Sequence, residues 1–383
     1  MIRIAHIGDQ HFNQRNRWDE CLRVMAWIAQ DIAARNVDLV LLGGDLFEKS
    51  PSHEETLAAA LWVQQLANAA EVVGVYGNHD KGGSLDVLGE LHATHPISIY
   101  ATPQVHSAAC GVQVACLPWP RKAHLLAALG REVGHEESAS IAQEALRDVY
   151  RGLAHQMDAR PWPRVGLAHV MIDGAKTDHE QPIVGADLAV SLADLGLLRA
   201  DYIACSHIHM HQEFMWSGAW FVYAGAPYHC NYGEFQPGKG YVVLDVADGA
   251  IEWERVAAPC TPMVLVETTW DGSGFDGGQR RLTDAEQTGA DVRLRYHVAE
   301  DQREAARAAA EDVKRELLDL GAARVTLDPV VRPVTRARAP EITEAKTLKD
   351  KLRTVWRVRG ESLEPEREER VLGKLSILED TAA

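Results

Sequence analysis

The stretch Val72-Val73-Gly74-Val75-Tyr76-Gly77-Asn78-His79-Asp80 decides the fold, because a short apolar run ends in a cluster of residues that can bind metal. Apolar runs of this length are typical of buried parallel strands. Four more clusters follow apolar runs in the same way: Asp9-Gln10-His11, Gly44-Asp45, Ala168-His169 and Ser206-His207-Ile208-His209. Since ligands of α/β sheets bind beyond the carboxyl ends of the strands, we expect the five clusters to converge on one site.

The composition excludes several classes of protein. The 383 residues contain no stretch of about 20 apolar residues, so we expect no membrane-spanning segment. No signal peptide precedes the first predicted strand, which begins at Ile2, and this favours a cytoplasmic location. The six cysteines form no Cys-x-x-Cys pair, so we expect reduced thiols rather than disulfides or a zinc knuckle.

The charge of the chain is unevenly distributed. A formal net charge of −16 is unusual for a protein that binds nucleic acid. Residues 332–359, however, hold nine Lys or Arg and three Asp or Glu, a net of +6. Such a segment can contact phosphates or an acidic partner, and a solvated helix face explains the same charges equally well.

Residues 1–262 are predicted to form the main domain. Apolar strands alternate there with helices, expected at 18–35, 54–69 and 138–157, and this pattern is typical of a layered α/β fold. After Ala200 the pattern changes to two β-hairpins, whose turns are Ser217-Gly218 and Asp248-Gly249.

The rest of the chain predicts two smaller parts. Residues 263–332 read as a small α+β domain with three strands and one Ala-rich helix. Residues 333–383 read as a linker followed by helices at 347–359 and 366–378, each with an apolar stripe.

The residue types of the five clusters suit a two-metal phosphoester hydrolase. Hydrolysis of a phosphoester needs a nucleophile at neutral pH and positive charge near the phosphate, and two divalent ions about 3.5–4 Å apart supply both. One carboxylate must then bridge the ions, while separate ligands hold each of them. Imidazole and carboxylate ligands together suit Mn, Fe or Zn, whereas oxygen ligands alone would suit Mg.

The order of the clusters resembles the calcineurin-like metallophosphoesterase superfamily, whose signature is D-x-H, G-D, G-N-H-[DE], G-H and G-H-x-H. The resemblance implies a four-layer β-sandwich flanked by helices, with Asp45 bridging two divalent ions. It implies two further sets of ligands: Asp9, His11 and His209 for one ion, and Asn78, His169 and His207 for the other.

The same resemblance assigns roles beyond metal binding. It implies that His79 faces the phosphate and protonates the leaving oxygen, while Asp80 orients His79 or its loop. Ala168 and Ser206 stand where the superfamily usually has glycine. Both side chains are small, so a tight turn is still expected there.

Shorter motifs point to one branch of the superfamily, the SbcD-type DNA exonuclease subunits. The similar segments are Leu46-Phe47-Glu48-Lys49-Ser50-Pro51-Ser52, Leu117-Pro118-Trp119-Pro120-Arg121, Tyr223-Ala224-Gly225-Ala226-Pro227 and Gly238-Lys239-Gly240-Tyr241. Glu48 differs from archaeal and eukaryotic relatives, which tend to carry His there. That branch has a small capping domain and C-terminal helices that dock on the coiled-coil base of an SbcC-type ABC ATPase.

The resemblance therefore implies a Mn²⁺-dependent DNA exonuclease and endonuclease that works with this ATPase. Its setting would be DNA end processing, repair, recombination or replication. A homodimer is also implied, through helices near Trp62 or Leu88.

Several residues have both a functional and a structural interpretation. Asn13, Arg15 and Arg17 are candidates for phosphate contacts, or belong to an ordinary polar loop. His211 is a candidate for touching substrate or metal, or lies at the rim. The predicted helix at 347–359 carries an apolar stripe that is expected to dock on the ATPase or to pack on the chain's own domains. The stripe consists of Leu348, Leu352, Val355 and Trp356.

Two other functions stay open from the sequence. A stand-alone phosphodiesterase or phosphomonoesterase that acts on nucleotides or other small phosphoesters needs the same clusters, but it gives no use to residues 263–383. A non-catalytic scaffold would have lost metal ligands, and none is lost here.

Overall fold

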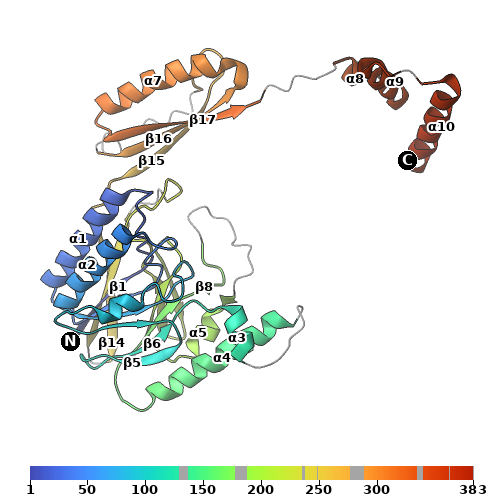
Figure 1. Ribbon diagram of the computed structural model, residues 1–383. Helices are drawn as coiled ribbons and strands as arrows, with labels where there is room; N and C mark the ends of the chain where they lie inside the picture. Colours follow the sequence, from blue (N-terminus) through green and yellow to red (C-terminus); the bar gives the residue numbers. More distant parts are fainter. Residues whose placement is uncertain are drawn as a thin grey trace. The chain divides into compact units, whose positions relative to one another are not determined.

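Two six-stranded sheets carry the five polar clusters in the computed structural model of the chain (Figure 1). The structure describes residues 1–128, 137–176, 188–234, 238–247, 249–276, 289–333, 340–361 and 363–382. The first sheet has the order β14 (Ala250–Ala257), β13 (Gly240–Ala247), β1 (Ile2–Ile7), β2 (Leu39–Leu42), β3 (Glu71–Val75), β4 (Ile97–Tyr100). The second has the order β11 (Gln212–Trp216), β12 (Ala219–Tyr223), β10 (Tyr202–Ser206), β7 (Arg164–His169), β6 (Gln113–Leu117), β5 (Gln104–Ser107).

The central strands of each sheet run parallel. β1 pairs with β2 and β2 with β3, while β6 pairs with β7 and β7 with β10, all in parallel register. Their carboxyl ends therefore lie at a common edge of each sheet, where the polar clusters begin. The two predicted hairpins are present as the antiparallel pairs β11–β12 and β13–β14.

Alternation along the strands produces the layers. In β1, Ile4 belongs to a buried cluster shared by both sheets, whereas Ala5 and Ile7 belong to a cluster shared with the helices outside the first sheet. Successive side chains of a strand point to opposite faces, so one face of each sheet packs on the other sheet and one face on helices. The predicted four-layer arrangement is thereby confirmed.

Helices cover the outer face of each sheet. The first sheet is covered by α1 (Trp18–Ala34) and α2 (His53–Ala69), which begins with a capping box between Ser52 and Glu55. The second is covered by α4 (Ser138–Met157) and α5 (Leu192–Gly196). Smaller elements of this part are η1 (Asp86–Glu90), α3 (Lys122–Ala128), β8 (Met171–Ile172) and β9 (Ala189–Val190).

The strands and helix predicted after residue 262 are present. A three-stranded sheet has the order β15 (Met263–Thr269), β16 (Asp291–Ala299), β17 (Arg324–Arg332), and η2 (Glu300–Gln302) and α7 (Arg303–Asp319) follow β16. The C-terminal helices are α8 (Pro340–Glu344), α9 (Leu348–Arg359) and α10 (Pro365–Ala382).

The described residues form two compact units. One contains residues 1–267, 289–295 and 312–328, and the other residues 268–276, 296–311 and 329–382. The predicted domain limits at residues 262 and 332 stay a prediction. None of the described helices is long and apolar enough to cross a membrane. All six cysteines are free thiols, as expected.

Candidate metal centre

Seven of the predicted ligands lie just beyond the carboxyl ends of five strands. Asp9 and His11 follow β1, Asp45 follows β2, and Asn78 follows β3. His169 ends β7, while His207 and His209 follow β10. Their side chains form two groups whose ligand atoms lie within 4.8 Å of one another: Asp9, His11 and His209, and Asp45, His169 and His207.

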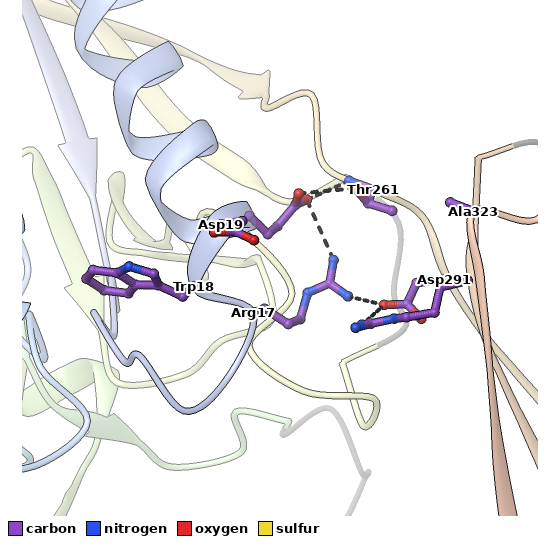
Figure 2. Close-up of a pocket in the computed structure, with 8 residues that line it drawn as sticks. Arg17, Trp18, Asp19, Thr261, Asp291 and Ala323 are labelled. Atoms are coloured by element: carbon purple, nitrogen blue, oxygen red, sulfur yellow. Dashed lines mark hydrogen bonds and ion pairs between the residues drawn. The ribbon is translucent and has the colours of Figure 1, made fainter.

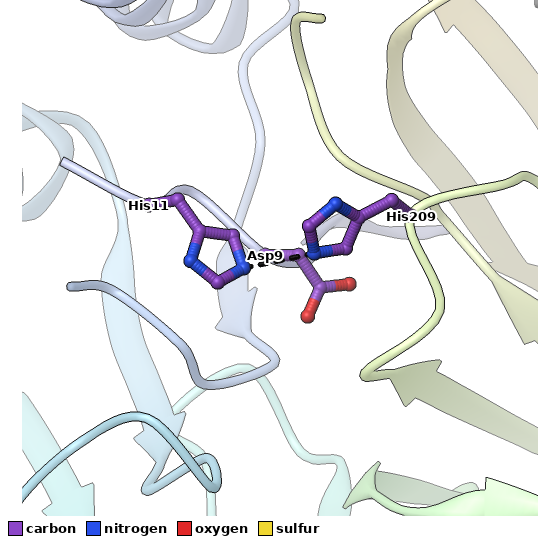
Figure 3. Close-up of side chains that lie close together, drawn as sticks. All are labelled: Asp9, His11 and His209. Carbon is purple, nitrogen blue, oxygen red and sulfur yellow. Dashed lines mark hydrogen bonds between the residues drawn. The ribbon is translucent and has the colours of Figure 1, made fainter. Parts of the chain in front are cut away.

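In the first group, two imidazole nitrogens face one point. Nε2 of His11 and Nε2 of His209 are 2.9 Å apart, with the Asp9 carboxylate beside them (Figure 3). The Asp9 carboxylate also accepts the backbone N–H of His207, at 2.9 and 3.1 Å to its two oxygens. Nδ1 of His209 lies 2.8 Å from Oε1 of Glu234 and donates to it, so Nε2 is the atom turned toward His11.

The second group surrounds the side chain of Asn78. Its Oδ1 lies 2.9 Å from Nε2 of His169 and 2.9 Å from Nδ1 of His207. Nε2 of His169 is 3.3 Å from Oδ2 of Asp45, and Nδ1 of His169 donates to the carbonyl oxygen of Gly43 at 2.8 Å. Nε2 of His169, Nδ1 of His207, Oδ1 of Asn78 and Oδ2 of Asp45 therefore lie close enough together to share one cation.

The carboxylates of the metal-free groups attract positive charge, and in the absence of an ion protons on neighbouring histidines supply it. Burial disfavours the charged imidazolium of His169 and His209, but the carboxylates of Asp45 and Glu234 outweigh it and raise the pKa of both to about 9. Burial and the neighbouring His169 lower the pKa of His207 to about 3, so its lone pair is free near neutral pH. Burial also opposes the ionisation of Asp45, yet His169 holds its pKa well below the usual range.

Residues 2–211, more than half of the chain, match the family described as calcineurin-like phosphoesterase. The chain belongs to this family. The SbcD component of nuclease SbcCD from Rhodobacter capsulatus is 30% identical over 279 residues, which cover 65% of this chain and 67% of that protein. The protein of the same name from Staphylococcus epidermidis is 21% identical over 295 residues, which cover 73% of this chain and 75% of that one. DNA double-strand break repair protein Mre11 of Archaeoglobus fulgidus is 34% identical over 88 residues, which cover 21% of this chain and 20% of that one.

These similarities confirm the resemblance that the sequence predicted, both to the family and to its SbcD branch. The family implies divalent metal ions, and the residues present fit them. Facing imidazole nitrogens beside a buried carboxylate repel or compete for protons when no cation lies between them. Mixed nitrogen and oxygen donors of this kind suit first-row divalent ions.

The backbone of this phosphoesterase is strained at four of the candidate ligands. φ is positive at Asp9 (49°), His11 (44°), Asp45 (52°) and His207 (108°). Such conformations are uncommon for residues other than glycine and concentrate at functional sites. The strain turns the chain sharply after each strand, which brings short side chains to one point.

Two glycines of the signature are required by close approach. Gly44 has φ 96°, and a Cβ there would lie 2.8 Å from Nδ1 of His169. A Cβ on Gly77 would lie 2.1 Å from Oδ1 of Asp45. A side chain at either position would displace His169 or Asp45.

His79 lies at a pocket beside the first group. The pocket has a volume of about 280 Å³ and is lined by His11, Asn13, Asn16, Glu48, His79, His209, Tyr228, Cys230 and Asn231. Nδ1 of His79 lies 2.8 Å from the backbone carbonyl oxygen of Glu48, and the side chain is 39% exposed. Nδ1–H of His79 donates a hydrogen bond to this carbonyl, so Nε2 is the atom left to act on a substrate.

Asp80 lies behind the loops rather than in the pocket. It is 1% exposed, and its carboxylate accepts the backbone N–H groups of Asp45 (2.9 Å), Gly77 (2.9 Å) and Phe47 (3.3 Å). Asp80 therefore ties the loop after β2 to the loop after β3. These contacts indicate that Asp80 positions the two loops and does not touch the substrate.

Two of the predicted substrate contacts lie elsewhere. The Arg17 guanidinium is 6% exposed and lies 2.7 Å from Asp291 and 3.7 Å from Glu20, as Figure 2 shows for Asp291. These carboxylates already pair with the Arg17 guanidinium, so a phosphate would have to compete with them for its charge. His211 belongs to neither ligand group among the described residues, and its Nδ1 lies 2.8 Å from the carbonyl oxygen of Tyr223.

The other candidates have mixed positions. Asn13 lines the pocket, and Arg15 next to it is exposed. In α9, Leu348 is 48% exposed, whereas Leu352, Val355 and Trp356 are half-buried. Trp62 and Leu88 are 3% and 1% exposed, so neither offers its own side chain to a second copy.

Sequence reasoning missed the acidic residues behind the imidazoles. Oε2 of Glu48 lies 2.9 Å from Nδ1 of His11, close enough for an ion pair although not aligned for a hydrogen bond. Glu234 holds His209 more firmly, because Oε1 accepts a hydrogen bond from Nδ1 at 2.8 Å. Trp119 stands out in the sequence only as part of a motif, and its ring lies against His207 with centroids 4.6 Å apart. The single signal available was that ligating histidines usually have a carboxylate or carbonyl partner.

Proposed function

We propose that this phosphoesterase is the nuclease subunit of a DNA-end-processing complex. It would hydrolyse phosphodiester bonds of DNA with two divalent ions and work with an SbcC-type ATPase. The observation that carries the proposal is the pair of ligand groups with His79 at the adjoining pocket. The names of the relatives, the SbcD component of nuclease SbcCD and the DNA repair protein Mre11, support DNA as the substrate.

The two ions, when bound, would activate a water molecule and neutralise charge on the phosphate. Asp9, His11, Asp45 and His209 would hold one ion, and Asp45, Asn78, His169 and His207 the other. We propose Mn²⁺ as the preferred ion because the donor set combines imidazole, amide and carboxylate groups.

The chain's own residues would do the rest. Nε2 of His79 would donate a hydrogen bond to the phosphate and then a proton to the leaving oxygen, since Nδ1 is engaged by the Glu48 carbonyl. Asp80 would hold the loops that carry Asp45 and Asn78. Asn13 and the exposed Arg15 are positioned to contact neighbouring phosphates.

The proposal includes three features of assembly and location. The exposed part of the α9 stripe, above all Leu348, would dock on the ATPase. A homodimer would use Leu57 and Leu61 of α2, which are 51% and 52% exposed and lie one helical turn apart. Six free thiols suit a reducing cytoplasm.

The decisive assay is digestion of linear and hairpin-ended DNA in Mn²⁺, beside hydrolysis of a small chromogenic phosphodiester. His79→Ala should lower both rates by about 10²–10⁴-fold and leave the metal content unchanged. His92→Ala, at an exposed histidine remote from the ligand groups, is the matched control and should keep wild-type rates. Wild-type turnover of the small ester, with no cleavage of DNA even when the ATPase is added, would favour a small-molecule phosphodiesterase instead.

A further inference from the structure

A buried carboxylate outside the predicted ligand set contacts the first metal group. Glu234 is 2% exposed and receives four hydrogen bonds. Oε1 accepts from Nδ1 of His209 at 2.8 Å and from Nδ2 of Asn231 at 2.9 Å. Oε2 accepts from Nζ of Lys239 at 2.9 Å and from the backbone N–H of Cys230 at 3.2 Å. All four donors fix the carboxylate in one orientation.

Lys239 secures the same histidine from a second direction. It is 3% exposed, and its Nζ donates to Glu234 and also to the backbone carbonyl oxygen of His209, at 3.0 Å. His209 is thus held at its ring and at its backbone by one ion pair. Burying such a pair costs desolvation energy that an apolar pair would avoid, so stability alone is a weak reason for its presence.

The two metal groups differ in how their histidines are held. In the second group, Nδ1 of His169 donates to the neutral carbonyl of Gly43. In the first group, His209 has the Glu234 carboxylate and His11 has Glu48 within 2.9 Å. A carboxylate partner makes the opposite ring nitrogen more basic and fixes its direction. In Figure 3 these opposite nitrogens, Nε2 of His11 and of His209, face each other beside Asp9.

We propose that Glu234 and Lys239 form a positioning pair that aims Nε2 of His209 at the first divalent ion and raises the affinity of that subsite above that of the second. This inference rests on the two-metal site proposed above. Neither side chain lines the pocket beside His79, so the pair acts through His209 and not on the substrate.

The test is Mn²⁺ binding to the full chain, measured by isothermal titration calorimetry and by electron paramagnetic resonance. Glu234→Gln tests the carboxylate, and the double variant Glu234→Gln with Lys239→Met keeps the buried charge balanced if the single variant fails to fold. The matched control is Glu71→Gln. Glu71 is 5% exposed, and its carboxylate lies 2.8 Å from Nε2 of His106. It begins β3, whereas Asn78 follows the other end of that strand.

Wild-type protein should bind two Mn²⁺ with unequal affinity. Both Glu234 variants should weaken the tighter event by about 10–100-fold and leave the weaker one unchanged. The rise in melting temperature caused by Mn²⁺ should shrink in these variants, but not in Glu71→Gln. A purely structural pair would lower the melting temperature in EDTA and leave the Mn²⁺-induced rise intact, and that result would overturn the inference.

The remaining outcomes separate the two proposals. Two ions bound by the double variant with wild-type affinities, or an equal loss at both subsites, would refute the positioning pair while the two-metal site stands. Fewer than two ions bound by the wild type would refute the two-metal site, and the positioning pair with it.

Discussion

Replacement of Asp80 should damage the centre without touching a metal ligand. The carboxylate is the common acceptor for the backbone N–H groups of Asp45, Gly77 and Phe47. In Asp80→Ala, the two shorter bonds leave buried donors unpaired, and each costs about 1–3 kcal/mol. The 3.3 Å bond to Phe47 adds little, so the expected loss of unfolding free energy is roughly 2–6 kcal/mol. That is a large part of the stability of about 5–15 kcal/mol that folded domains have.

Asp80→Asn sharpens the test. One oxygen can still accept from Asp45 and Gly77, but the NH₂ group must face the N–H of Phe47, so the loss should fall to about 1–3 kcal/mol. Urea unfolding of EDTA-treated protein measures both variants. Asp86→Asn is the control, because this exposed carboxylate accepts a single bond from the Tyr76 hydroxyl at 2.7 Å. If Asp80→Ala unfolds at the same urea concentration as the control, Asp80 does not hold the loops together.

Three further predictions concern Arg17, pH and α9. Arg17→Ala should lower the unfolding free energy by only about 1–3 kcal/mol, because Arg324 and Tyr232 still bond to Asp291. DNA affinity should stay unchanged, and weaker DNA binding at wild-type stability would favour the phosphate-contact interpretation. The pKa values of His169 and His209 are raised to about 9 in the metal-free fold, so protonation of these histidines stabilises it. This stabilisation is complete below pH 6.5, the ordinary pKa of histidine, and disappears as the pH rises through 9. Mn²⁺ must displace these protons, so the affinity for Mn²⁺ should rise as the pH rises from 6.5 to about 9. Calorimetry in buffers of different ionisation enthalpy measures the protons released on binding, and no release near neutral pH would contradict this prediction. Leu348→Glu should weaken binding to the ATPase at least 10-fold without affecting hydrolysis of a chromogenic diester. The control Leu318→Glu, at a 40% exposed leucine of α7, should bind the ATPase normally. Equal binding by both variants would show that α9 is not part of the interface.

The positions of the candidate ligands in the fold could be predicted from sequence because each depends on a local pattern. A strand that ends in Gly77-Asn78-His79-Asp80 places those side chains at the sheet edge whatever the rest of the chain does. The same holds for Asp45 after β2 and His169 at the end of β7. Strand order brings the clusters together, and the parallel pairings follow from the alternation of strands with helices.

Contacts between residues that no local motif links could not be predicted. Arg17 looked free because its partner, Asp291, lies 274 residues away. His211 was a candidate for touching substrate or metal, with a rim position as the alternative, and its Nδ1 is engaged by the carbonyl of Tyr223 on the neighbouring hairpin strand. Glu234 and Lys239 had no motif spacing relative to His209. Long-range polar pairing of this kind leaves no periodic signal in a single sequence.

The left-handed backbone at Asp9, His11, Asp45 and His207 has a consequence for the protein in the cell. Each such residue costs on the order of 1–3 kcal/mol, and binding of ions to the folded state alone offsets that cost. When the supply of divalent ions falls, a larger fraction of molecules should therefore be unfolded and open to proteases. Metal starvation would then reduce the amount of this phosphoesterase as well as its activity, so the supply of metal would control how much of the protein a cell retains.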